Sequence, residues 1–319
     1  MIKKISHHKI FVKKYLIIDG ISRTGKMMMS KIIPTLKNFE QVEYIEFIEY
    51  MLAALNLKKV SFDYANSFIV QTLNEMSYNK MIGRKQNLRS TDVTSIGKFY
   101  SKNIYKKRTR FPEGRGVINL LKKNKNYFPL MSHDLMINYN FFKNLDIKYK
   151  MIQIYRNPFD IIYSWNKRNW GNRFQIDPQP SALLISSKNK LYPWHVAGRE
   201  IKWQKKNSVE RCSDMVINLI NKSIKNHKKV KNDKNIITIS YEDFIQHTQK
   251  NLYDICKFLN TKKTKKTDKS LKEEKCPKKY INNLYLKKKL FIKSKVKKST
   301  FKKICILEKN YQNNVYNLK

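Results

Sequence analysis

The chain has few of the residues that build disulfide scaffolds and metal sites. Only four cysteines occur among its 319 residues, at positions 212, 256, 276 and 305, and no two of them form a CxxC pair. This spacing argues against cross-links and favours free thiols in a reducing cytoplasm. The six histidines show no metal-ligand spacing either. We therefore expect neither a disulfide framework nor a metal ion.

Long apolar runs are absent as well. No stretch reaches the roughly eighteen apolar residues of a membrane-spanning helix. Residues 1–14 are basic but contain no continuous apolar segment and no small-residue cleavage site, which argues against a secretory signal. We expect a cytoplasmic protein without a membrane span; the sequence does not fix its oligomeric state.

Acidic residues are scarce, and this makes the chain strongly basic. It has 24 Asp and Glu against 67 Lys and Arg, a net charge of +43. Basic patches often bind nucleic acid, but here the charge is diffuse and accompanies an excess of Asn, Ile, Tyr and Phe, as expected from an AT-rich genome. We expect no specific nucleic-acid partner. The positive field still attracts a nucleotide with several phosphates, or an acidic glycan.

The first informative segment is an apolar run that enters a glycine-bracketed turn. Residues 16–18 are predicted to form a buried strand, and residues 26–36 a helix that Pro34 disturbs near its end. Between them, Gly20 and Lys26 have the GxxxxGK spacing of a phosphate-binding loop. Successive backbone N–H groups and the helix N-terminus of such a loop form an anion site.

This loop lacks one element of a nucleotide-hydrolysing site. An ATP- or GTP-hydrolysing loop needs Ser or Thr after its lysine, because that hydroxyl binds magnesium. Here the position is Met27, and a thioether is a poor ligand for a hard cation. The loop therefore keeps its anion-binding groups without the metal ligand. A simple strand-to-helix turn is the alternative interpretation.

A second apolar run ends in an arginine. Residues 151–155 are predicted to form a strand that ends before Arg156, and Pro158 is suited to the first turn of the next helix. Arg156 thus stands at the carboxyl end of a strand, where open α/β sheets bind ligands. Its planar guanidinium can hold a phosphate through two hydrogen bonds. Ser164, eight residues on, adds a hydroxyl donor.

These segments resemble the sulfotransferase family. Residues 156–164, Arg-Asn-Pro-Phe-Asp-Ile-Ile-Tyr-Ser, resemble its 3'-phosphate-binding segment, in which Arg and Ser stand eight apart. Residues 23–26 resemble its 5'-phosphosulfate loop, which needs no metal. Residues 235–244 and 252–259 resemble its late strand, its Tyr-Glu-Asp turn with Glu242 as a structural anchor, and the following helix. The resemblance covers residues 14–260, with the motifs in family order.

The resemblance implies a parallel sheet flanked by helices, in the P-loop nucleotide-binding style. Residues 1–260 would form this α/β domain, and residues 261–319 a lysine-rich loop and a C-terminal helix packed on it. The implied donor is 3'-phosphoadenosine 5'-phosphosulfate (PAPS), and no metal is implied. Lys26 stands where the family has Thr or Ser, so either Arg23 or Lys26 could contact the bridging oxygen. The implied nucleotide-binding residues are Ser22, Arg23, Thr24, Gly25, Lys26, Met27, Arg156 and Ser164.

Sulfuryl transfer also needs a base for the acceptor proton. His133 follows an apolar run and precedes Arg156 by twenty-three residues. Cytosolic sulfotransferases place their catalytic histidine at a similar spacing, so the resemblance implies this role for His133. Asp134 is an alternative. Carbohydrate-modifying relatives use a Glu after the first helix, and the acidic residues at 40, 43, 46 and 49 recur there with the spacing of one helix face.

Three questions stay open in the sequence. Arg84 and Arg89, in the polar stretch 82–96, either contact an anionic acceptor or nucleotide over the site or belong to a salt-linked surface connection. The acceptor carries a hydroxyl or amine and can be a glycan, a lipid or a small alcohol. The rival functions are a P-loop kinase that uses ATP and a non-enzymatic basic module that binds polyanions.

Overall fold

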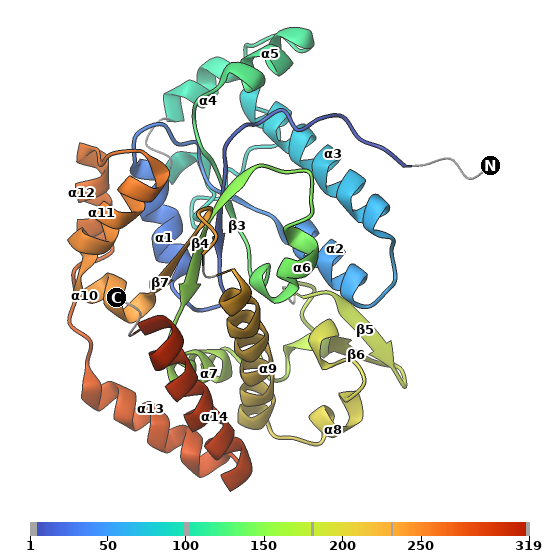
Figure 1. Cartoon of the computed structure of the whole chain (residues 1–319), viewed down its shortest axis with the longest axis vertical. Helices are drawn as coiled ribbons and strands as arrows, with labels where there is room; N and C mark the ends of the chain where they lie inside the picture. Colours follow the sequence, from blue (N-terminus) through green and yellow to red (C-terminus); the bar gives the residue numbers. More distant parts are fainter. Residues whose placement is uncertain (1–4, 99–101, 180–181, 231, 317–319) are drawn as a thin grey trace.

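The computed structural model describes residues 5–98, 102–179, 182–230 and 232–316. At its centre lies a five-stranded parallel sheet with the strand order β2-β3-β1-β4-β7, and helices cover both of its faces (Figure 1). A separate two-stranded sheet pairs β5 with β6 in antiparallel fashion. This architecture confirms the predicted α/β fold.

The first half of the chain contains four strands of the large sheet and the helices α1 to α7. In chain order these elements are β1 Tyr15–Asp19, α1 Lys26–Ile32, β2 Glu43–Tyr44, α2 Glu46–Asn56, α3 Phe62–Met81, α4 Lys102–Arg108, α5 Arg115–Lys123, β3 Phe128–Met131, α6 Tyr139–Phe142, β4 Tyr149–Tyr155 and α7 Pro158–Lys167. The second half is mostly helical: β5 Leu184–Ser187, β6 Lys190–Pro193, α8 Glu200–Gln204, α9 Ser208–Lys229, β7 Ile236–Ser240, α10 Tyr241–Gln246, α11 Thr248–Leu259, α12 Lys265–Glu273, α13 Asn282–Lys295 and α14 Lys298–Tyr311.

The middle strand, β1, is buried on both faces. Successive strand side chains point to opposite faces. Tyr15 and Ile17 therefore join the apolar cluster of α2, α3 and α6, whereas Leu16 and Ile18 join that of α1, α10 and α11. A strand with helices on both sides needs such a continuous apolar run. The position of β1 at the middle of the sheet places the loop that follows it at the centre of the carboxyl edge.

The C-terminal helices pack on α7 and α9. The rings of Phe159 on α7 and Phe301 on α14 lie 5.8 Å apart, and Ile304 is fully buried in the cluster that these helices share. Glu242 anchors the region from the sheet side: its Oε1 accepts a hydrogen bond from Asn157 N at 3.0 Å, and its Oε2 one from the Tyr311 hydroxyl. The carboxyl edge of β4 and β7 is thereby fastened to α14.

One segment differs from the sequence expectation. The lysine-rich run expected as a loop forms α12, because Thr264 and Thr267 make a capping box and Leu271 provides a buried contact. Earlier in the chain, the segment between α7 and α8 contains the β5–β6 hairpin. Helices α8 and α9 are separate, and Asn207 caps the second.

Among the residues that the structure describes, none of the helices combines the length and the apolar character needed to cross a bilayer.

We predict that Ile304→Ala destabilises the protein by roughly 2–4 kcal/mol, because it leaves a cavity between α14 and its neighbours. Urea unfolding followed by tryptophan fluorescence measures this loss. Ile306→Ala, on the same helix but 50% exposed, is the matched control and is expected to change the free energy of unfolding by less than about 0.5 kcal/mol. Equal effects of the two substitutions would contradict the docking of α14.

Candidate active site

Four segments of the chain meet at the carboxyl edge of the sheet. Parallel strands end on one edge, and ligands of open α/β sheets bind there. The loop 20–25 follows β1, residues 132–134 follow β3, Arg156 follows β4, and Tyr241 follows β7. The segments that the sequence singled out therefore lie beside one another, although they are far apart along the chain.

Two glycines allow the loop after β1 to lie against its neighbours. Gly20 and Gly25 have φ angles of 146° and 104°, a region that side chains rarely adopt. A Cβ on Gly20 would lie 2.3 Å from the carbonyl oxygen of Ile154, and one on Gly25 2.4 Å from the ring of Tyr241. Gly25 caps α1, and its carbonyl oxygen accepts hydrogen bonds from the N–H groups of Met28 at 3.0 Å and Met29 at 3.2 Å. Helix geometry therefore leaves the N–H groups of Lys26 and Met27 as the donors of this turn that an anion could use.

Side chains connect this loop to the turn after β4. The indole Nε1 of Trp165 donates to Ser22 O at 2.9 Å, and Arg156 Nη1 donates to Arg23 O at 3.1 Å. The Nε of Arg23 in turn donates to Ser164 Oγ at 3.1 Å. The two predicted phosphate-binding segments thus form one continuous surface.

Three guanidinium groups gather at this contact. Arg168 Nη1 reaches Ser164 Oγ at 3.2 Å, beside Arg23 and Arg156. Burial lowers the pKa of Arg23, and the like charges of Arg168 and Arg156 lower it further. Among the described residues, no carboxylate lies at ion-pair distance from these three arginines. A multiply charged anion would reduce the repulsion between these three positive charges.

The guanidinium of Arg156 is fixed by stacking and keeps one donor unpaired within the described part of the chain. Its guanidinium stacks on the ring of Tyr241 at 4.3 Å, and its buried Nε has no partner among the described residues. An unpaired buried donor is costly unless a ligand satisfies it.

The other residues of the loop have distinct environments. Thr24 is buried, and its Oγ1 donates to Ile21 O at 2.9 Å, which stabilises the turn. Lys26 is also buried, and its ammonium group donates to Gly20 O inside the loop. Met27 is 42% exposed, and its Sδ accepts a hydrogen bond from the Tyr44 hydroxyl at 3.2 Å.

Buried carboxyl groups surround the Lys26 ammonium. Burial lowers the pKa of Lys26 to about 8, whereas Asp19, Glu49 and Asp134 act in the opposite direction. Asp19 is fully buried and accepts hydrogen bonds from Ser132 Oγ at 2.7 Å and from the N–H groups of residues 134–136. It therefore fixes the turn that carries His133. Burial and the charge of Glu49 raise the pKa of Asp134 well above its usual range, which favours the protonated form of this carboxyl.

His133 lies beside Glu49. Its backbone N–H donates to Glu49 Oε1, and its Nδ1 lies 3.4 Å from the same oxygen. With Nδ1 turned toward this carboxylate, Nε2 is the ring nitrogen left for a substrate.

The remaining acidic residues of the 40–49 series have different surroundings. Glu40 is buried and makes two hydrogen bonds to Arg108, both at 2.9 Å, so its role is structural. Glu43 pairs with Lys80. Burial raises the pKa of Glu46, and the charge of Glu49 adds to this.

A family model described as a sulfotransferase domain matches residues 14–313. The chain belongs to the sulfotransferase family. The match extends past the region of the sequence motifs and includes α13 and α14. The protein is therefore a sulfotransferase enzyme.

Comparison with solved structures shows distant likeness. The sulfotransferase domain of the Synechococcus PCC 7002 olefin synthase is 13% identical, with a TM-score of 0.44 over 82% of this chain and 78% of that one. The sulfotransferase STF1 of Mycobacterium tuberculosis is 10% identical, with a TM-score of 0.43 over 95% of this chain and 77% of that one. A search of curated protein sequences finds no significant match.

A small cavity beside the loop 20–25 has aromatic walls. Trp165 and Trp170, with ring centroids 5.3 Å apart, line it together with Ser22, Asp134, Arg173, Phe174, Ala182, His195 and Leu219. Burial lowers the pKa of His195 to about 3, so its ring is neutral. Neither ring nitrogen has a partner among the described residues. The cavity therefore combines apolar walls with an unpaired polar group.

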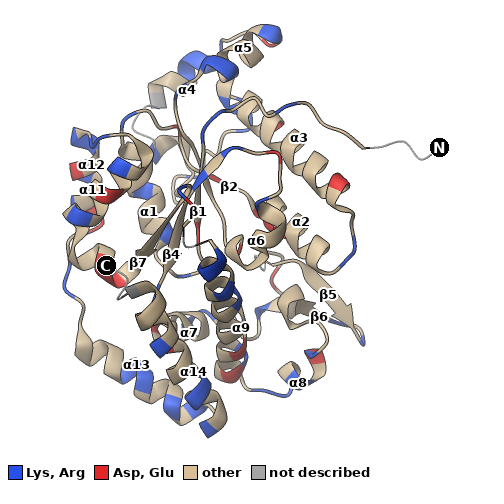
Figure 2. Ribbon diagram, viewed as in Figure 1, with Lys and Arg blue, Asp and Glu red and all other residues tan. Residues whose placement is uncertain are grey.

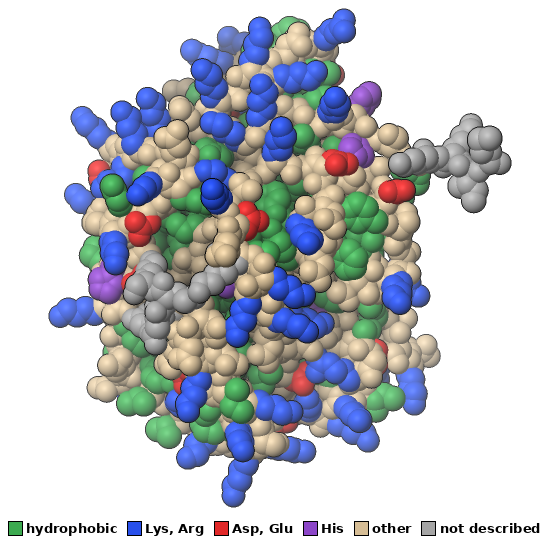
Figure 3. Space-filling view, viewed as in Figure 1, with side chains coloured by type: hydrophobic (Ala, Val, Ile, Leu, Met, Phe, Trp, Pro, Cys, Tyr) green, Lys and Arg blue, Asp and Glu red, His purple; other side chains and the backbone are tan. Residues whose placement is uncertain are grey.

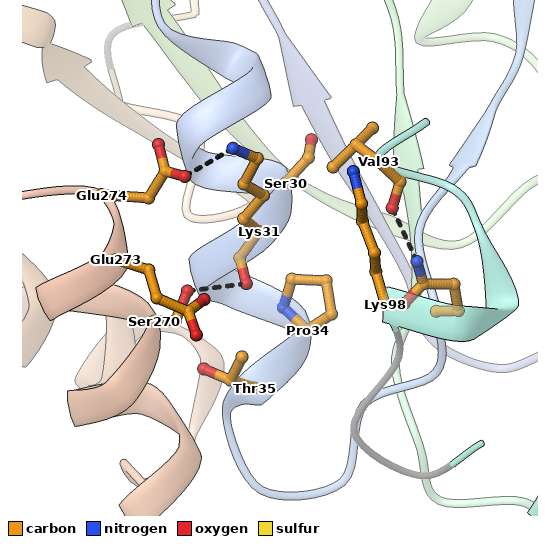
Figure 4. Close-up of a pocket in the computed structure, with 10 residues that line it drawn as sticks. Ser30, Lys31, Pro34, Thr35, Val93, Lys98, Ser270, Glu273 and Glu274 are labelled. Carbon is orange, nitrogen blue, oxygen red and sulfur yellow. Dashed lines mark hydrogen bonds and ion pairs between the residues drawn. The ribbon is translucent and has the colours of Figure 1, made fainter. Parts of the chain in front are cut away.

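Another pocket lies on the far side of α1, between α1, α12 and residues 93–98 (Figure 4). Polar residues that line this pocket interact with one another. Lys31 forms an ion pair with Glu274 at 2.5 Å, and Ser270 Oγ donates a hydrogen bond to Lys31 O at 3.2 Å. It contains neither the loop glycines nor Arg156, so it is separate from the site at the sheet edge.

Arg84 and Arg89 make local contacts. Arg84 pairs with Glu113 in an exposed position, and Arg89 Nε donates to Thr91 Oγ1 at 3.0 Å. These contacts correspond to the alternative of a salt-linked surface connection.

Sequence reasoning missed two residues of the site. Tyr241 supports both Gly25 and Arg156, and its only signal was its place after the last predicted strand. Arg168 stands four residues after Ser164, the spacing of neighbours on a helix surface, and this signal could have found it.

We predict that Asp134→Asn removes a pH-dependent loss of stability. In the unfolded chain Asp134 ionises near pH 4, whereas in the folded protein burial shifts its ionisation to higher pH. Above that pH the unfolded state binds fewer protons, so wild-type stability falls as the pH rises, by up to about 1.4 kcal/mol per pH unit.

The comparison is made by urea unfolding between about pH 5 and pH 7, below the range in which Lys26 titrates. Asparagine matches aspartate in shape, so the backbone strain of the φ of 135° at this position is nearly the same in both proteins. Parallel pH profiles of the two proteins would show that Asp134 is ionised in the native state.

Proposed function

We propose that this sulfotransferase moves the sulfuryl group of PAPS to a hydroxyl or amine of an acceptor. The observation that carries the proposal is the meeting of Arg23, Arg156 and Arg168 at the contact between the two predicted phosphate-binding segments, where no carboxylate of the described residues lies at ion-pair distance. A nucleotide with phosphate groups at both its 3' and 5' positions supplies the negative charge that this arrangement needs.

The residues present fit such a nucleotide. Among the described residues the buried Nε of Arg156 has no hydrogen-bond acceptor, and a phosphate oxygen could supply one. Gly25 carries no side chain, so the loop can lie against Tyr241 and its backbone N–H groups stay uncovered. In the proposal, the N–H groups of residues 22–27 hold the 5'-phosphosulfate, and Arg156 and Ser164 hold the 3'-phosphate. When bound, PAPS supplies an activated sulfuryl group.

Of the two loop cations, we assign the contact with the bridging oxygen to Arg23. Its side chain is partly exposed, whereas the Lys26 ammonium is buried and already bonded to Gly20 O. Lys26 then contributes positive charge from beneath the loop and keeps the turn closed. Cations placed where charge develops on a leaving group stabilise the transition state.

His133 is the proposed base. The Glu49 carboxylate lies 3.4 Å from Nδ1 without a hydrogen bond, and it stabilises the positive charge that the ring gains when Nε2 takes the acceptor proton. Asp134 is the alternative base, and burial raises the pKa of its carboxyl. Glu46, partly exposed on α2, is the reserve base.

The cavity between Ser22 and Asp134 has a volume of about 30 Å³, which is room for one water-sized group and too small for an acceptor ring. The neutral His195 offers one donor and one acceptor to a polar group of that size. We therefore place the acceptor outside this cavity and assign to it only the hydroxyl or amine that receives the sulfuryl group.

Calorimetry with 3',5'-ADP, the expected product, tests the donor. We expect 3',5'-ADP to bind more tightly than ATP and without magnesium. Arg156→Lys is expected to weaken binding by roughly tenfold or more, because lysine cannot replace the two-pronged contact. Arg84→Lys, at an exposed position outside the site, is the matched control and should bind as the wild type does.

Binding of ATP at least as tight as that of 3',5'-ADP, and dependent on magnesium, would instead support a P-loop kinase. Absence of binding for both nucleotides, together with salt-sensitive DNA binding, would support a non-enzymatic basic module.

We predict that His133→Ala lowers turnover by at least about a hundredfold, because the acceptor proton loses its base. Transfer of labelled sulfate from PAPS to a panel of phenols, alcohols, amines and glycosides measures turnover. The affinity for 3',5'-ADP should stay unchanged, since the backbone N–H of residue 133 still reaches Glu49. If Glu46→Gln abolishes transfer while His133→Ala does not, the base is Glu46.

A further inference from the structure

The hairpin of α13 and α14 exposes an unusual number of large aliphatic side chains. Leu286 and Leu290 are 52% and 63% exposed, and they stand four residues apart, one turn along the same face of α13. Ile306, 50% exposed, adds an apolar side chain from α14, whereas Leu284, two residues from Leu286, points to another side of α13. We call the exposed side of these two helices the α13–α14 surface.

The α13–α14 surface is also strongly basic. Residues 282–311 contain ten lysines and one acidic residue, Glu308, which is buried. Figure 2 shows the lysines along both helices, and Figure 3 shows basic and apolar side chains intermixed where these helices lie. Eight of the lysines are exposed: Lys287, Lys293, Lys295, Lys297, Lys298, Lys302, Lys303 and Lys309.

The exposed leucines are not the result of a poorly docked helix. The inner face of α13 is fully engaged: Ile292 is completely buried, and the ring of Phe291 lies 5.5 Å from that of Tyr163 on α7. Lys288 pairs with Asp160, and Lys289 with Glu308 at 2.9 Å. The partners of α13 within the chain are therefore on one side, and the leucines lie on the other.

We propose that the α13–α14 surface binds the face of an anionic lipid membrane. Helices that lie in a membrane interface combine apolar side chains, which enter the acyl region, with lysines at headgroup level. Lysine stems extend along apolar surface while the ammonium groups reach the phosphates. Near an anionic leaflet, each lysine strengthens the attachment.

The apolar component distinguishes this partner from nucleic acid. A phosphate backbone would satisfy the lysines, but it would leave Leu286 and Leu290 in water. An anionic bilayer satisfies both kinds of side chain. Two helices packed on the enzyme would then attach it peripherally, and this inference does not depend on the donor or the acceptor of the reaction.

Co-sedimentation with vesicles tests the proposal on the full chain. We expect binding to vesicles of phosphatidylcholine mixed with phosphatidylserine, and little binding to phosphatidylcholine alone. Leu286→Ser/Leu290→Ser is expected to lower partitioning by more than about tenfold, because two apolar side chains no longer enter the bilayer. Lys293→Glu/Lys302→Glu is expected to cause a similar loss at low ionic strength.

Matched controls carry the same substitutions on another part of the surface. Leu88→Ser/Ile104→Ser replaces side chains that are 78% and 46% exposed, and Lys106→Glu/Lys107→Glu reverses two exposed charges on α4. Both should partition within about twofold of the wild type. The urea midpoint verifies that every variant is folded.

Three results would overturn the proposal. The first is equal binding to neutral and anionic vesicles. The second is partitioning that falls as much in the control variants as in the α13–α14 variants. The third is binding of a duplex DNA fragment, without vesicle binding, that the leucine substitutions leave unchanged; the surface would then recognise phosphate alone.

Discussion

The contact between the loop after β1 and the turn after β4 is the interaction on which the site depends. Gly20 lets the loop pass close to the backbone of β4, and Gly25 lets it lie against Tyr241. The hydrogen bonds from Arg156 to Arg23 O and from Arg23 to Ser164 then hold the two segments together. Without this close approach, the arginines would be isolated charges instead of one cationic cluster.

Charge is distributed in two layers at this edge of the sheet. The arginines lie at the contact between the loops, while beneath the loop Lys26 is surrounded by Asp19, Glu49 and Asp134. Burial raises the free energy of the charged form of each group, so it lowers the pKa of Lys26 and raises that of Asp134. Positive charge therefore remains where it can meet an anion, and the negative charge is kept inside.

The fold was largely predictable because its strands carry strong local patterns. The apolar run of β1, the Pro at the start of α7 and the glycine spacing all act within a few residues. Helix α12 was missed, because nine residues of mostly polar sequence form a helix only when Thr264 caps it and Leu271 is buried. Of the site, the sequence identified the loops but missed the role of Tyr241. Its ring meets Arg156 only because β4 and β7 are neighbours in the sheet, and no short sequence pattern records this contact.

The sequence by itself determined the glycine and arginine spacing from which phosphate binding is predicted and that the loop lacks a magnesium-binding hydroxyl, because both properties belong to residue types at fixed short spacing. Only the tertiary structure decided that Arg23 and Ser164 touch, that Glu40 is tied to Arg108 and that Glu49 faces His133. These pairings join residues separated by 68 to 141 positions. The strand order of the sheet sets them, and no local pattern encodes it.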